Sequence, residues 1–162
     1  MPKSECWGGK TYDLSHLEPI RMEVEYEEKK ILVKRMVTFL FSCHCYSRSP
    51  VENEDVHHDM VVMDGNCQRV FSEERYELSM CLPDLVRDLP NQKIYQTEHR
   101  NYLHLPYVDK LGQKFTYLVA IRIKKSGGDI LVRIESAYPI DKLEDHRKRN
   151  KPMRFKVALS KA

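Results

Sequence analysis

The sequence predicts an α+β protein with an N-terminal β-hairpin, a short helix pair, and then a mostly antiparallel sheet packed on the helices. Two observations support this class: strand-like segments occupy both halves of the chain, and residues 72–89 between them have helical spacing. Helices gathered on one face of an antiparallel sheet are the usual solution for this order of elements. At 162 residues the chain has the length of one domain, and we expect a single domain over residues 1–162.

The first hairpin is expected within residues 22–46. Val24 and Tyr26 alternate with glutamates, and residues 27–30 turn the chain into a second strand over residues 31–45. Residues 47–66 follow, with a Ser-Arg-Ser-Pro sequence, an acidic patch and an Asp-Gly pair. This composition predicts a long loop.

Residues 72–89 form the predicted helical segment. Ser72 is expected to cap it, with two glutamates in the first turn, where the helix dipole favours anions. Pro83 is expected to divide the segment into two short helices, and the Pro-Asn pair at 90–91 to end it. An apolar stripe at helical spacing should face the core: Leu78, Leu82, Leu85 and Leu89.

The rest of the chain is predicted to be rich in strands. A hairpin is expected over residues 117–138, because two β-branched apolar runs flank a Ser-Gly-Gly-Asp turn. We expect a basic loop at residues 141–152. The predicted strands are residues 93–96, 101–107, 114–123, 130–138 and 153–159.

Alternation along these strands separates apolar from polar side chains, because successive residues of a strand point to opposite faces. Val119 and Ile121 share one face, whereas Arg122 lies on the other. If the apolar sets pack under the helices, one open face carries a mixed polar set. Its members are Tyr102, His104, Arg122, Arg133, Glu135, Arg154 and Lys156.

An imidazole, a carboxylate and several arginines are the ingredients of metal-independent RNA cleavage. A base removes the 2′-hydroxyl proton, an acid protonates the leaving oxygen, and cations stabilise the transition state. We expect Glu135 and His104 to supply base and acid, beside Arg122 and Arg133. The alternative is a solvated face of cross-strand pairs, and one β-bulge would reverse the alternation beyond it.

Basic residues are concentrated at the end of the chain, although the net charge is only +3. From Arg147 onwards there are seven Lys or Arg and no Asp or Glu, a pattern typical of polyanion binding or of a solvated basic tail. We expect nucleic-acid contacts here and at Tyr102. The expected residues are Arg147, Lys148, Arg149, Arg154 and Lys156.

The five cysteines are odd in number and irregularly spaced, which favours a reducing compartment over a disulfide framework. Cys43 and Cys45 are separated by one residue, too close for the usual structural zinc pair. We therefore expect buried strand cysteines with His44 on the opposite face, and no metal cofactor. No segment is long and apolar enough for a membrane span or a signal peptide, so a cytoplasmic protein without membrane contact is expected.

Three segments of the chain are similar to an uncharacterised proteobacterial family labelled stationary phase growth adaptation protein: ECWGGKTYDLS, FSCHCYSR and RVFSEERYELSMCLPDLV. The order of elements from residue 72 to 159, with the sequence Glu-Ser-Ala-Tyr-Pro at 135–139, also resembles the small bacterial RNase toxins of barnase, EndoU and RelE type. That second resemblance implies a metal-independent site of Glu135, Ser136 and Tyr138, with Arg122 and Arg133 as phosphate ligands. It also implies RNA as a partner and a neutralising protein as a second one.

The sequence therefore predicts a metal-independent endoribonuclease of bacterial toxin type. One alternative is a non-enzymatic protein- or RNA-binding protein of phage or mobile-element origin. Another is a zinc-stabilised binding module, for which the candidate ligands are Cys43, His44, Cys45, His57, His58 and Cys67. Cleavage of RNA in the presence of a chelator separates the first from the other two, and the metal content of the purified protein separates the third.

Overall fold

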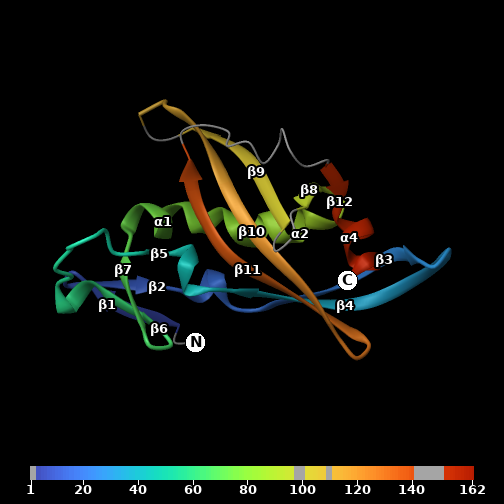
Figure 1. Cartoon of the computed structure of the whole chain (residues 1–162), viewed down its shortest axis with the longest axis horizontal. Coiled ribbons are helices and arrows are strands. Elements are labelled where there is room, and N and C mark those ends of the chain that lie inside the picture. The colour runs from blue at the N-terminus through green and yellow to red at the C-terminus, as the bar shows by residue number, and fades with distance from the viewer. Residues whose placement is uncertain (1–2, 97–100, 109–110, 141–151) are drawn as a thin grey trace.

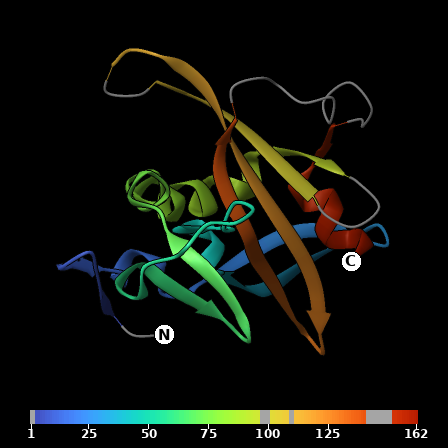
Figure 2. The same ribbon diagram turned by 60° about the vertical axis from the view of Figure 1, so that its left-hand side comes forward.

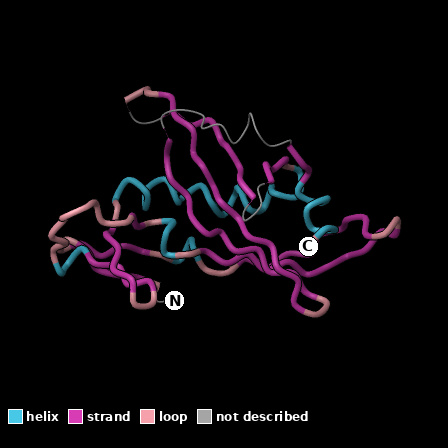
Figure 3. Tube along the Cα trace, viewed as in Figure 1, coloured by secondary structure: helices cyan, strands magenta, loops and turns pink. Residues whose placement is uncertain are grey.

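A computed structural model describes residues 3–96, 101–108, 111–140 and 152–162; at His104 and residues 106–108 it describes the backbone alone. It confirms the α+β class, with strands predominating (Figure 3). Among the described residues, no helix combines the length and apolar content needed to cross a membrane.

The main element is a seven-stranded sheet in the order β12-β8-β9-β10-β11-β4-β3 (Figure 1). Neighbouring strands are antiparallel except β11 and β4, which run parallel. This pair joins the early hairpin to the late strands. The strands are β3 (Ile20–Glu28), β4 (Ile31–Phe41), β8 (Lys93–Gln96), β9 (Asn101–Val108), β10 (Lys114–Ser126), β11 (Asp129–Ile140) and β12 (Pro152–Arg154).

Both predicted hairpins are confirmed: β3 pairs with β4, and β10 pairs with β11. The β10–β11 ladder contains a bulge, because Ala120 pairs with Ser136 whereas Ile121 pairs with Ile134. Glu135 is the extra residue, so even-numbered residues of β11 face the core before it and odd-numbered residues face the core after it. Beyond the bulge, Ala137 is buried in the core.

Two smaller sheets lie at the end of the molecule that holds the N-terminal hairpin (Figures 1 and 2). One is the hairpin β1 (Ser4–Trp7) and β2 (Lys10–Asp13); the other has the order β5-β7-β6, from β5 (Ser47–Arg48), β6 (Val61–Asp64) and β7 (Cys67–Phe71). The prediction of a loop over the whole of residues 47–66 is therefore wrong. These strands are two to five residues long, which gives the alternation pattern too few positions to register.

The helical segment is as predicted. It comprises α1 (Glu73–Leu78), a 3₁₀ turn (Ser79–Cys81), α2 (Leu82–Asp88) and a second 3₁₀ turn (Leu89–Asn91). Ser72 caps α1, since its hydroxyl accepts a hydrogen bond from the Arg75 backbone N–H at 3.3 Å. Pro83 lies in the first turn of α2, and the four leucines of the stripe are buried.

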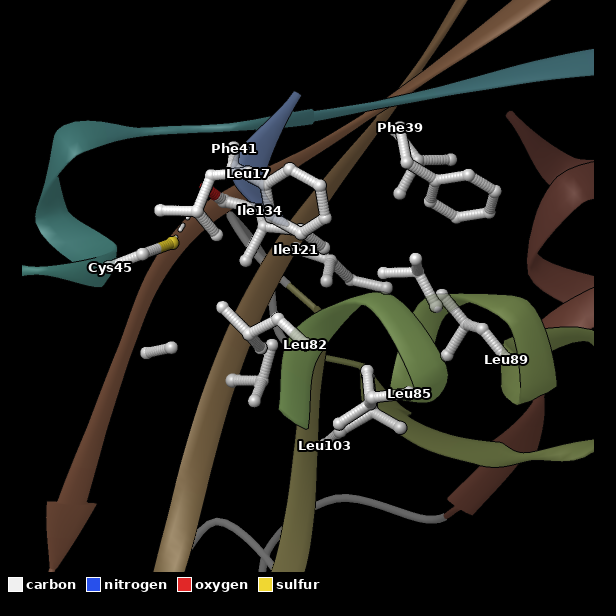
Figure 4. Close-up of a cluster of buried hydrophobic side chains, with 14 of the residues drawn as sticks. Leu17, Phe39, Phe41, Cys45, Leu82, Leu85, Leu89, Leu103, Ile121 and Ile134 are labelled. Atoms are coloured by element: carbon white, nitrogen blue, oxygen red, sulfur yellow. Dashed lines mark hydrogen bonds between the residues drawn. The ribbon is translucent and has the colours of Figure 1, made fainter. Parts of the chain in front are cut away.

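The core lies between these helices and one face of the sheet (Figure 4). Leu82 and Leu89 pack there with Phe39, Ile121 and Ile134, and all five are fully buried. Burial of each such side chain contributes about 1.5–3 kcal/mol. In Figure 1, β10 and β11 pass in front of α1 and α2, so the helices cover the rear face of these strands.

The predicted strand over residues 153–159 is wrong beyond Arg154. Its first part belongs to β12, whereas Phe155–Lys161 form helix α4. Phe155, Ala158 and Leu159 are buried at helical spacing, and Val157, which a strand would have buried, is 41% exposed. Lys156 therefore lies on a helix rather than on the open sheet face.

Candidate nucleic-acid interface

Four exposed cations occupy two adjacent rows of the sheet face opposite the helices. Arg122 and Arg133 are direct cross-strand partners on β10 and β11. The next row of the same face runs across four strands, Lys124–Leu131–Thr38–Arg21. We call the exposed side chains of these two rows the basic band: Arg21, Arg122, Lys124 and Arg133.

Glu135 lies beside this band because the bulge provides an extra position for it. Its Oε1 is 3.5 Å from Arg122 Nε, and its side chain is 15% exposed against 57% for Arg122. The prediction that Arg122, Arg133 and Glu135 share a face is confirmed at this point. One carboxylate pairs with Arg122, while Arg133 adds a second positive charge opposite it.

The other residues predicted for the open face are more scattered. Tyr102 pairs in register with Ala120 and with Tyr95, and His104 pairs with Leu118, but the His104 side chain lies outside the described residues. Arg147, Lys148 and Arg149 are also outside them. Arg154 is exposed at the far edge, on β12, where it pairs with Lys93.

The end of this face that carries the Glu-Ser-Ala-Tyr-Pro sequence is covered. Ser136, Leu118 and Ala120 are buried. The guanidinium carbon of Arg75, from α1, lies 5.1 Å from the centre of the Tyr138 ring, a cation–π contact. The structure therefore leaves the basic band, rather than the Ser136 and Tyr138 end, open to a large ligand.

A second cluster forms where β4 ends. Residues 43–45 were predicted to continue the strand, but β4 ends at Phe41 and Cys43–Cys45 form a 3₁₀ turn. The turn brings Cys43 and His44 together instead of pointing them to opposite faces. Their ligand atoms and a carboxylate oxygen of Asp64 lie within 4.8 Å of one another, and His44 Nε2 is 2.6 Å from Asp64 Oδ2.

The electrostatics of this cluster do not suit a cysteine nucleophile. Burial, and then the charge of Asp64, raise the pKa of Cys43, whereas catalytic thiols need a lowered one. The hydrogen bond from His44 lowers the pKa of Asp64. Burial raises the pKa of Cys45 to about 12, and its Sγ contacts the Ile134 carbonyl at 4.0 Å (Figure 4).

One buried and one half-buried arginine hold the surrounding segments in place. Arg69 is buried and donates to the hydroxyl and the carbonyl of Ser47 at 2.8 and 2.9 Å. Arg75 donates to the same carbonyl at 2.7 Å. Burial lowers the pKa of both guanidinium groups, and we assign them a structural role in tying β7 and α1 to β5.

Sequence reasoning missed three of the residues that matter here. The predicted strand 114–123 ends one residue before Lys124, although Lys124 follows Arg122 by two residues and the same alternation includes it. Arg21 could not be found, because it joins the row of Lys124 and Leu131 only through Thr38 on β4, and those two residues are more than a hundred positions away in the chain. Asp64 meets His44 only through the tertiary fold.

A family model described as the YjaZ family matches residues 4–162. The match agrees with the resemblance to an uncharacterised bacterial family, and the chain belongs to the YjaZ family. No curated protein and no solved structure matches the chain. The comparisons therefore lend no support to the resemblance to RNase toxins.

Proposed function

We propose that this member of the YjaZ family binds single-stranded RNA across the basic band. The observation that carries the proposal is the direct pairing of Arg122 with Arg133 on the open face. Like charges placed opposite each other on a sheet repel, and a polyanionic ligand bound over them would offset that repulsion. Lys124 and Arg21 extend the positive surface across four strands.

RNA fits this surface better than a small anion does. The band spans several strands, a length that suits consecutive phosphates of a chain. Tyr95 and Tyr102 are half-buried cross-strand partners on the same face, in the row that continues through the buried Ala120 and lies next to the row of Arg122. Unpaired bases stack on aromatic rings in many single-strand binders, at about 1–3 kcal/mol per base.

The experiment is a fluorescence anisotropy titration of a labelled single-stranded RNA at several salt concentrations. If the four cations each contact a phosphate, the logarithm of affinity should fall with the logarithm of salt concentration with a slope of about −3. The double variant Arg122→Glu/Arg133→Glu should weaken binding at least tenfold and reduce the slope by about 1.4.

The matched control is Arg87→Glu/Lys161→Glu. Both residues are exposed and lie on helices of the opposite side, and the double change alters the net charge equally. This control should bind nearly as the wild type does. Equal weakening in the two double variants, both verified as folded by circular dichroism, would refute an interface at the basic band.

Cleavage of the bound RNA stays a prediction of the sequence, and the same samples test it. If Glu135 is the general base, wild-type protein shortens the RNA in the presence of a chelator. Glu135→Gln should then slow cleavage about a hundredfold. RNA that is bound but keeps its length identifies a non-enzymatic binder.

A further inference from the structure

Three metal-ligating side chains meet at the junction of the two larger sheets. Cys43 and His44 come from the turn after β4, and Asp64 comes from the end of β6. One ligand atom from each lies within 4.8 Å of the other two, and all three side chains are half-buried. Half-burial limits competition from water but leaves a path for an ion.

The backbone around the cluster is fixed by hydrogen bonds. The Ser42 hydroxyl accepts from the His44 N–H at 3.1 Å, and the Ser42 N–H donates to the Ile134 carbonyl at 3.0 Å. The Ser47 hydroxyl donates to the Cys43 carbonyl at 2.7 Å. The turn that carries two ligands is thus anchored at both ends before any ligand binds.

Cys67 is a candidate fourth ligand, although its sulfur lies outside the group of atoms within 4.8 Å of one another. It is the cross-strand partner of Asp64 across the tight turn at Gly65 and Asn66. Directly paired residues of an antiparallel ladder point to the same face, with Cβ atoms about 5 Å apart. Cys67 is exposed, so its side chain has room to turn towards the cluster.

We propose that Cys43, His44 and Asp64 bind a zinc ion, with Cys67 as the fourth ligand. Two sulfurs, an imidazole nitrogen and a carboxylate oxygen form a set that suits tetrahedral zinc, whereas magnesium and calcium prefer oxygen alone. Binding releases the thiol protons to solvent, and the ion joins the end of β4 to the β6–β7 hairpin. None of the four ligands belongs to the basic band, although the charge of Arg133 reaches Asp64.

Cys45 does not take part. It is fully buried and its sulfur faces the Ile134 carbonyl in the core. The ligand spacing therefore differs from the Cys-x₂₋₄-Cys pairs of common structural zinc sites. Here two ligands are adjacent in the chain, and the other two are cross-strand partners on the β6–β7 hairpin. This explains why the spacing test on the sequence disfavoured a metal.

The test is a titration of reduced, metal-free full-length protein with Co²⁺, followed by displacement with Zn²⁺. One equivalent should bind, with sulfur-to-cobalt charge-transfer absorption that zinc abolishes. Cys43→Ser and Asp64→Asn should each weaken binding at least tenfold, and Cys67→Ser should weaken it and lower the charge-transfer absorption. Zinc should raise the midpoint of thermal unfolding of the wild type and not that of Cys43→Ser.

Cys6→Ser is the matched control, because Cys6 is an exposed thiol on β1 whose sulfur contacts the Thr11 hydroxyl. It should bind metal as the wild type does. Wild-type protein without charge-transfer absorption, or binding that Cys43→Ser retains, would overturn the site. Unchanged binding in Cys67→Ser would overturn the assignment of the fourth ligand.

Discussion

Arg122 and Arg133 differ in their electrostatic surroundings although they face each other. Arg122 pairs with Glu135 at 3.5 Å, and Arg133 brings a like charge opposite Arg122. Such a pair costs about 0.2–1 kcal/mol. Arg133 also acts on Asp64, because its positive charge helps to lower the pKa of that carboxylate.

This asymmetry gives a prediction for two single variants. Arg133→Gln removes the repulsion from Arg122 together with the attraction to Asp64, so the free energy of unfolding should change by less than about 0.5 kcal/mol. Arg122→Gln leaves Glu135 without its partner, so stability should fall. Urea unfolding measures both, and an equal loss of stability in the two variants would contradict this account of the pair.

Glu28 provides an acid-sensitive contact between the two hairpins. Lys125 Nζ lies 2.8 Å from its Oε1, and this hydrogen bond is the main cause that lowers the pKa of Glu28, with Arg35 adding to it. In the unfolded chain the pKa is about 4.3. The contribution to stability is therefore complete above that value and is lost as pH falls through the lower folded pKa.

Replacing Glu28 with Gln should remove this part of the acid dependence. The stability difference between wild type and Glu28→Gln should be constant near neutral pH and shrink towards zero below pH of about 4. Lys125→Met should flatten the profile in the same way, since it removes the main partner. Urea midpoints measured between pH 7 and pH 3 test this, and parallel profiles would argue against it.

At the scale of elements, the two-residue turn of the β3–β4 hairpin has lysine at both positions, where Gly and Asn are usual. Lys29 and Lys30 have φ of 51° and 66°, the left-handed region that favours Gly and Asn. A side chain there costs about 1–2 kcal/mol, whereas glycine costs about 0.5–1 kcal/mol in chain entropy. Relief of strain is the larger of the two effects.

Lys30→Gly should therefore stabilise the protein by up to about 1 kcal/mol. Lys30→Ala removes the same charge but keeps a Cβ, so it should give no such gain. Thermal or urea unfolding of the two variants separates backbone strain from charge. A gain of similar size in both would assign the effect to charge.

Local patterns explain which elements the sequence predicts well. The two hairpins and the helical segment depend on neighbouring residues: alternation, a Ser72 cap, leucines at helical spacing. Residues 153–159 were predicted as a strand because the apolar Met153, Phe155, Val157 and Leu159 alternate with other residues. The spacing of Phe155, Ala158 and Leu159 also fits a helix. In the structure, packing against the sheet favours the helix, with Phe155 6.3 Å from Phe39 between ring centres.

The candidate sites depend on contacts that no local pattern encodes. The parallel pairing of β11 with β4 places Arg21 in the same band as Arg122 and Lys124. A single bulge decides where Glu135 lies, and the 3₁₀ turn after β4 decides that Cys43 and His44 point together. Sequence alternation therefore identified Arg122 and Arg133, and could not identify Arg21 or Asp64.

At the scale of the whole molecule, the helices cover one face of the large sheet and the band lies on the other. This arrangement gives the protein a core-facing side and a ligand-facing side. The small β5-β7-β6 sheet is held to the large one through the turn after β4. RNA bound at the band should therefore leave the helices unperturbed.

The most direct test of RNA binding at the basic band is a nuclear magnetic resonance titration of ¹⁵N-labelled protein with single-stranded RNA. The account predicts that amide shifts concentrate on β3, β4, β10 and β11 around Arg21, Arg122, Lys124 and Arg133, with few on α1, α2 and α4. Shifts that concentrate on the helices, or no shifts at low salt, would contradict it.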